Sequence, residues 1–201
     1  MQPQLCRPIV LIGMMGAGKT AVGTQLARIL GVPFIDSDSE IERAAQMSVA
    51  EIFARDGEAF FRARESEVLS RLMNARPAVL STGGGAFLSE TNRATIAKRG
   101  TSVWLKADLE ILWNRVRHKT TRPLLRTDDP KATLAGLLAE RAPVYALAQV
   151  VVEAEPLLSI EGMARKVIDA LRAAPGVFAP GAGPQDTAVP GTAPGQKGAT
   201  T

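Results

Sequence analysis

The stretch that most constrains this chain of 201 residues is GMMGAGKT, Gly13 to Thr20. It comes directly after the apolar run IVLI and directly before an apolar pattern of helical period. It matches the whole G-x-x-x-x-G-K-[ST] motif, whose glycines let successive backbone N–H groups turn inward around a phosphate. The motif needs a strand before it and a helix after it, and both patterns are present. It therefore predicts an α/β domain that binds a nucleoside triphosphate; a glycine-rich turn without a ligand is the alternative.

Each residue type in this loop suits one part of a nucleotide. The inward N–H groups are expected to cradle the β-phosphate, reinforced by the positive end of the helix that starts near Lys19. Lys19 can reach the β- and γ-phosphate oxygens, and the Thr20 hydroxyl can bind Mg²⁺. The predicted phosphate-binding residues are Gly13, Gly16, Ala17, Gly18, Lys19 and Thr20.

Short β-rich segments alternate with helical patterns along the chain, which is typical of a parallel sheet between two layers of helices. The expected fold class is three-layer α/β with five strands, at residues 8–12, 33–35, 78–82, 102–106 and 149–153. Helices are expected at residues 19–30, 37–73 with breaks, 90–99, 108–117, 131–147 and 159–173. Two helix starts have capping-box spacing, Ser37 with Glu40 and Ser48 with Glu51.

The end of the chain has a different composition. Beyond Ala174 it is dominated by Pro, Gly, Ala and Thr without an apolar period. Such a segment cannot offset the entropy lost on ordering. We expect one domain over residues 1–174 and a disordered tail over residues 175–201.

Charge and composition restrict the partners. The net charge is +4 and the pI about 9.6, but aromatic residues are only 4% and no dense Lys/Arg block occurs. We therefore expect small anionic ligands and no nucleic acid. No apolar stretch approaches the roughly 20 residues of a membrane span, and the first ten residues do not resemble a signal peptide. A cytoplasmic monomer that does not bind membranes is expected, and Cys6, the only cysteine, excludes an internal disulfide.

The loop alone does not identify the acceptor of the γ-phosphate. The strings Asp-x-x-Gly and Asn-Lys-x-Asp of GTPases do not occur, and the third strand ends LSTGGG without the acidic pair of motor ATPases. The second strand ends in DSD, at the sheet edge where ligands of such folds bind. One of Asp36 and Asp38 could hold the water shell of Mg²⁺ while the other faces an acceptor hydroxyl. Alternatively, both acids only favour the helix dipole.

Other residues suit an anionic acceptor. Arg62 and Glu65 are three apart on a predicted helix, so Glu65 can orient the guanidinium, although a surface ion pair has the same spacing. Gly83 to Gly85 either let a ligand approach the backbone or form only a flexible turn.

The segment from residue 117 to 130 is polar, basic and long for a connection, and it predicts an active-site lid. Arg122 within it could close over the transferring phosphoryl group. His118, the only histidine, is expected to lie in this loop without a catalytic part. Arg141, in RAPVY, could serve the lid or a substrate carboxylate.

Taken in order, GMMGAGKT, DSD, FRARE, STGGG, RPLL and RAPVY resemble the shikimate kinase family over about residues 8–168. The resemblance implies a nucleoside-monophosphate-kinase-like fold with strand order 2-3-1-4-5. It also implies phosphate transfer from ATP to the 3-hydroxyl of shikimate, in aromatic amino-acid (chorismate) biosynthesis, with Mg²⁺.

Residue roles follow from the same resemblance. It implies catalytic parts for Lys19, Asp38 and Arg122, and roles through metal-bound water for Asp36 and Ser81. Arg115 would lie against the adenine, although Arg117 is only two residues away. The implied shikimate ligands are Asp38, Arg62, Gly84, Gly85 and Arg141.

Two alternatives share the loop. A sugar-acid kinase such as gluconate kinase is not expected to carry RPLL and RAPVY together. A regulatory module that only binds nucleotide would release no ADP in response to shikimate.

Overall fold

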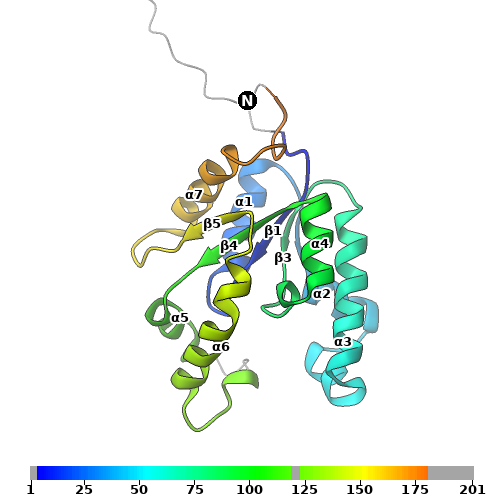
Figure 1. The fold of residues 1–201 in the computed structure, drawn as a ribbon, viewed down its shortest axis with the longest axis vertical. Helices are drawn as coiled ribbons and strands as arrows, with labels where there is room; N and C mark the ends of the chain where they lie inside the picture. The colour runs from blue at the N-terminus through cyan, green and yellow to red at the C-terminus, as the bar shows by residue number, and fades with distance from the viewer. Residues whose placement is uncertain (1–3, 119–122, 181–201) are drawn as a thin grey trace, which may run out of the picture.

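The computed structural model describes residues 4–118 and 123–180 and shows a five-stranded parallel sheet of order β2-β3-β1-β4-β5 (Figure 1). The predicted fold class and strand order are confirmed. The strands are β1 (Ile9–Ile12), β2 (Phe34–Asp36), β3 (Val79–Ser81), β4 (Thr101–Lys106) and β5 (Val150–Glu153).

Helices cover both faces of the sheet. On one face, α1 (Lys19–Leu30) packs against α7 (Ile160–Arg172); on the other, α4 (Glu90–Arg99) packs against α3 (Val49–Met73). The remaining elements are α2 (Ser37–Ala45), α5 (Leu109–Val116), α6 (Pro130–Tyr145) and the 3-10 turns η1 (Ala86–Leu88) and η2 (Pro123–Leu125). The bounds of α1 and α4 are the predicted ones, whereas neither 3-10 turn was expected.

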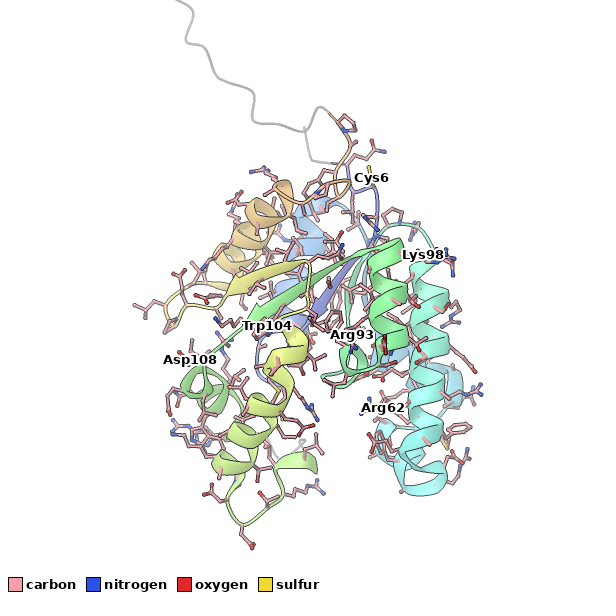
Figure 2. All side chains as sticks on the ribbon, in the orientation of Figure 1. Cys6, Arg62, Arg93, Lys98, Trp104 and Asp108 are labelled. Carbon is pink, nitrogen blue, oxygen red and sulfur yellow. The ribbon has the colours of Figure 1, made fainter. Side chains whose placement is uncertain are left out.

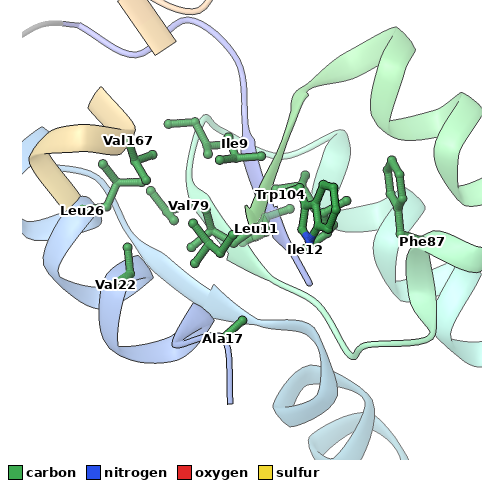
Figure 3. Close-up of a cluster of buried hydrophobic side chains, with 14 of the residues drawn as sticks. Ile9, Leu11, Ile12, Ala17, Val22, Leu26, Val79, Phe87, Trp104 and Val167 are labelled. Atoms are coloured by element: carbon green, nitrogen blue, oxygen red, sulfur yellow. The ribbon is translucent and has the colours of Figure 1, made fainter. Parts of the chain in front are cut away.

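The core lies on both sides of β1, whose four residues are all buried. Figure 3 shows Val22, Leu26 and Val167 on one side of this strand, and Trp104 and Phe87 on the other. A strand buried on both faces reads as a continuous apolar run rather than an alternation, which is why IVLI precedes the loop.

The register of the central strands brings three loops to one edge of the sheet. Ser81 at the end of β3 pairs with Asp36 at the end of β2 and with Leu11 of β1. The strands are parallel, so the segments after β1, β2 and β3 all begin at this edge.

Two predicted helix starts differ in outcome. Ser48 and Glu51 form the predicted capping box at the start of α3, with the serine oxygen accepting from the Glu51 N–H and the glutamate from the Ser48 N–H. A helix does begin at Ser37, but the predicted capping box there is wrong, because Asp36 caps α2 and accepts from the N–H groups of Asp38 and Ser39. A carboxylate one residue earlier satisfies the free donors and leaves Ser37 inside the helix.

The predicted start of the tail is also too early. Val177 is fully buried, its carbonyl accepts from the Cys6 N–H at 2.9 Å, and the Ala179 N–H donates to Gln4 at 3.0 Å. The segment from residue 175 to 180 therefore pairs with the N-terminal segment through backbone hydrogen bonds, and Val177 and Phe178 pack against the core. Two adjacent apolar residues are too few to make a periodic pattern in the sequence. The rest of the predicted tail, residues 181–201, lies outside the described residues.

Within the two described ranges, no helix has both the length and the apolar character needed to cross a bilayer.

Candidate active site

The loop between β1 and α1 is a tight turn set by its glycines. Gly13, Gly16 and Gly18 have φ of 136°, 83° and 96°, a region that other residues rarely adopt. A Cβ on Gly16 would lie 2.8 Å from Val116 of α5, and one on Gly13 would lie 2.9 Å from the Leu105 carbonyl. Both positions thus require glycine for conformation and for space. The positive φ values let the loop turn tightly between β1 and α1, as the motif predicted.

Two predicted nucleotide-binding cations lie against this loop. The Lys19 ammonium donates to the carbonyls of Gly13 (2.8 Å) and Met14 (3.1 Å). Arg115 donates to the carbonyls of Gly16 (3.2 Å) and Ala17 (3.3 Å). Both charges therefore lie against the loop that is predicted to bind the phosphates.

A cavity of about 420 Å³ extends from the loop to the start of α7. Arg115 lines it, whereas the exposed Arg117 does not, so the geometry favours Arg115 for contact with a base. The far wall was not predicted, because nothing in the sequence marks the segment after β5 as part of a site. The residues of that wall are Ala154, Glu155, Leu158, Ser159, Ile160 and Met163.

The ends of β2 and β3 supply the predicted metal-side oxygens. Asp36 and Ser81 are register partners at the sheet edge, and Ser81 is 2% exposed. One oxygen of Asp36 is engaged in capping α2, which fixes the orientation of its carboxylate. Thr20 is exposed at the start of α1. These are hard oxygen donors of the kind that Mg²⁺ prefers, but they are too few to form a complete site.

Asp38 lies at the same edge, in the first turn of α2. Burial raises the pKa of its carboxyl group, the Asp36 carboxylate raises that pKa further, and the Lys19 ammonium opposes both. One of its oxygens is buried and has no hydrogen-bond partner among the described residues. A carboxylate held in this way can accept a hydrogen bond from an acceptor hydroxyl.

The three glycines after β3 each lie against a different charged side chain. A Cβ on Gly83 would be 2.9 Å from Asp38, one on Gly84 would be 3.4 Å from Arg141, and one on Gly85 would be 2.6 Å from Arg62. The turn brings together residues from α2, α3 and α6, of which the first and last, Asp38 and Arg141, are 103 positions apart. Close approach, rather than flexibility alone, accounts for the run of glycines.

Arg62 is oriented by acids on its own helix. It donates to Glu65 at 2.9 Å and to Glu58 at 3.2 Å, and Figure 2 shows it on the side of α3 that faces α6. Glu65 is only 1% exposed, so this is not the ordinary surface ion pair that the spacing alone would allow. Burial raises the pKa of Glu65, and the Arg62 guanidinium opposes that rise.

Arg141 and Tyr145 occupy the C-terminal end of α6. The Nε of Arg141 is buried without a hydrogen-bond partner in the described part of the chain. Tyr145 is fully buried, and its hydroxyl donates to the Gly84 carbonyl at 2.5 Å. Sequence reasoning gave this tyrosine no part in the site, because an aromatic residue at a helix end usually reads as core.

Most predicted site residues thus converge on one edge of the sheet, in two adjoining parts. One part is the phosphate loop together with the cavity that reaches the start of α7. The other part is the glycine turn together with Asp38, Arg62 and Arg141. Arg122 lies outside the described residues, so its predicted lid role stays a prediction.

Comparison with known proteins decides the family. A family model described as shikimate kinase matches residues 15–172. The chain belongs to the shikimate kinase family. The shikimate kinase of Ruegeria pomeroyi is 63% identical over 167 residues, covering 83% of this chain and 86% of that relative. The shikimate kinase of Cereibacter sphaeroides is 60% identical over 175 residues, covering 87% of each chain.

A solved structure supports the same assignment. The shikimate kinase of Acinetobacter baumannii in complex with shikimate matches with a TM-score of 0.78 at 38% identity, over 83% of this chain and 93% of that one. Membership of the shikimate kinase family confirms the resemblance carried by the six motifs. It also separates this chain from the gluconate kinases and from regulatory nucleotide-binding modules.

Proposed function

We propose that this chain transfers the γ-phosphate of ATP to the 3-hydroxyl of shikimate, giving shikimate 3-phosphate and ADP, a step in aromatic amino-acid biosynthesis. The observation that carries the proposal is the glycine turn, which has Asp38, Arg141 and Arg62 against its three successive residues beside the phosphate loop. Shikimate carries one carboxylate and ring hydroxyls, and these groups match two arginines and one carboxylate.

The acceptor side would work by orientation. Arg62 and Arg141 would bind the carboxylate through charge-assisted hydrogen bonds, with the N–H groups of Gly84 and Gly85 as further donors. Asp38 would accept a hydrogen bond from the reacting hydroxyl and hold its oxygen in line with the γ-phosphate. Alignment of this kind removes several kcal/mol from a barrier, on the order of 7–11 kcal/mol in well-oriented systems.

The donor side would work by charge. The N–H groups of the phosphate loop and the Lys19 ammonium would stabilise the negative charge on the β- and γ-phosphates. Arg115 would contact the adenine in the cavity next to α7. The predicted lid arginine, Arg122, would add a further positive charge to the transferring group.

Mg²⁺ fits the oxygens of this site. In the two described ranges, no three His, Cys, Asp or Glu side chains gather where they could hold a metal. A Mg²⁺ ion would therefore be bound mainly by phosphate and water, with the Thr20 hydroxyl as a ligand and Asp36 and Ser81 through water. When bound, the ion would neutralise charge on the phosphates. Removal of Mg²⁺ with a chelator should abolish turnover and leave the melting temperature of the free chain unchanged.

A panel assay tests the proposal. ADP release is measured with ATP and Mg²⁺ plus shikimate, quinate or gluconate, and ³¹P NMR locates the new phosphate ester. Release that depends on shikimate, with the ester on the 3-oxygen, is expected. Equal or faster release with gluconate, or release that no acceptor stimulates, would contradict the proposed function. The cytoplasmic location and the monomeric state stay predictions, which cell fractionation and sedimentation can test.

A further inference from the structure

Tyr145 is the only tyrosine in the chain and it has no exposed surface. Its ring lies 6.0 Å from that of Trp104, and its hydroxyl reaches Gly84 O at 2.5 Å and the Met14 sulfur at 3.8 Å. Burial raises the pKa of this phenol, an effect that Arg141 opposes. The group therefore stays protonated at neutral pH and acts as a hydrogen-bond donor.

The hydrogen bond from Tyr145 belongs to a series that holds the whole turn. The carbonyls of Gly83 and Gly85 accept from the N–H groups of Ala86 and Leu88, within the turn itself. The next carbonyls accept from α4, where Asn92 donates to Ala86 at 2.9 Å and Arg93 donates to Phe87 and Leu88 at 2.9 and 2.8 Å; Figure 2 shows Arg93 beside η1.

Gly84 differs from its neighbours in the origin of its partner. Its carbonyl bonds to α6, the helix that also carries Arg141 one turn before Tyr145. A Cβ on Gly84 would lie 3.4 Å from Arg141 and 3.5 Å from the Tyr145 hydroxyl. Arg141 and Tyr145 thus both contact Gly84. Arg141 brings its positive charge close to this residue, and Tyr145 donates a hydrogen bond to its carbonyl.

We propose that Tyr145 is a positioning residue for the acceptor, because its hydroxyl fixes the glycine turn to the helix that carries Arg141. This inference rests on the proposed function. The turn and the arginine then meet the carboxylate of shikimate as one preorganised unit. Without this hydrogen bond, the Gly84 carbonyl would lose its link to α6 while the bonds within the turn remained, and binding of the acid would have to restore the placement of the turn relative to Arg141.

The direct test is Tyr145→Phe, which removes one oxygen and keeps the ring against Trp104. A matched control is Ser102→Ala, since Ser102 is 3% exposed and its buried hydroxyl also bonds a backbone group, the Gln149 N–H at 3.0 Å, away from the site. The KM values for shikimate and for ATP are measured for the full chain and both variants. Loss of one such bond predicts a rise of about five- to tenfold in the shikimate KM of Tyr145→Phe. The ATP KM should stay within about twofold, and Ser102→Ala should change neither value by more than that.

A spectroscopic measurement covers the case in which Tyr145→Phe does not fold. Because the chain has one tyrosine, uniform 3-fluorotyrosine labelling gives a single ¹⁹F signal, from Tyr145. Shikimate alone should shift this signal, and a non-hydrolysable ATP analogue alone should shift it less.

Three results would overturn the inference while leaving the proposed function intact, two of them kinetic and one spectroscopic. One is a Tyr145→Phe variant with an unchanged shikimate KM in an enzyme that phosphorylates shikimate normally. Another is an equal rise in both KM values, which would indicate a general structural role. A ¹⁹F signal that shikimate leaves unmoved would count against it in the same way. A parent chain that does not phosphorylate shikimate would contradict the proposed function and this inference together.

Discussion

Gly85→Ala isolates the contact between the glycine turn and Arg62. Gly85 has φ −92° and ψ −19°, which alanine adopts without strain, so the backbone accepts the new methyl group. That methyl carbon would lie 2.6 Å from both terminal nitrogens of Arg62 and 2.8 Å from its Cζ. An ordinary contact starts near 3.4 Å, so the guanidinium must move away by about 0.8 Å, the difference between the two distances. The substitution thus displaces the arginine without removing its charge.

Gly85→Ala should weaken the use of shikimate but not the use of ATP. A hydrogen bond to a charged group contributes about 1.5–3 kcal/mol, so losing the Arg62 geometry should lower kcat/KM for shikimate by roughly 10- to 150-fold. The ATP KM should stay within about twofold, because Arg62 is not among the residues beside the phosphate loop. The melting temperature should fall as well, because displacement of the guanidinium weakens its ion pair with the buried Glu65 carboxylate.

Steady-state kinetics with either substrate varied, together with thermal melting, measures these effects. Gly136→Ala is the matched control, because a Cβ there meets nothing within 4 Å on the exposed side of α6. It should keep full activity and melt at the same or a slightly higher temperature. A Gly85→Ala variant with parental kcat/KM for shikimate, or with equal losses for shikimate and ATP, would refute the assignment of Arg62 to the acceptor.

Three further results are expected. Removing residues 181–201 should change neither melting temperature nor turnover. Removing residues 175–201 should cost roughly 2–4 kcal/mol of unfolding free energy, because it strips a buried valine and two backbone hydrogen bonds. Equal melting temperatures of the two truncated chains would contradict the pairing of residues 175–180 with the N-terminal segment. Arg115→Ala should raise the ATP KM several-fold and Arg117→Ala should not. The opposite result would assign the adenine contact to Arg117 instead of Arg115. Asp38→Asn should abolish transfer yet raise the unfolding free energy at pH 7 by about 0.5–1 kcal/mol. A carboxyl whose pKa is raised on folding has its full cost in stability above the folded pKa; the cost shrinks as the pH falls below that pKa and is gone below the lower pKa of the unfolded chain, so the advantage of asparagine should vanish in acid.

The fold could be predicted closely because its signals are local. The buried run before the phosphate loop, the glycines with positive φ and the capping box at Ser48 are each set by a few neighbouring residues. The errors arose where a competing group a residue or two away, or a distant segment, decided the outcome. Asp36 displaced Ser37 as the cap of α2, and Val177 was ordered by the N-terminal segment.

The candidate site likewise contains residues that short motifs predict and contacts that only tertiary structure sets. The loop residues and the acids after β2 stand in short motifs whose chemistry can be read directly. The contacts of the glycine turn could not be, because Tyr145 meets Gly84 only after β3 and α6 are brought together across 61 positions. The wall that the segment after β5 contributes to the cavity beside the phosphate loop is similarly set by tertiary structure and has no motif of its own.

The central claim is that Arg62 and Arg141 bind the carboxylate of shikimate, and a comparison of the acid with its neutral amide tests it most directly. The measured quantity is the ratio of kcat/KM for shikimate to kcat/KM for shikimate amide, in the parent chain and in Arg62→Lys and Arg141→Lys. Lysine keeps the charge but loses the paired geometry of the guanidinium, so each variant should lose far more activity on the acid than on the amide, and the ratio should fall by about tenfold or more. An unchanged ratio in both variants, with equal losses on the acid and the amide, would contradict the claim that these arginines bind the carboxylate.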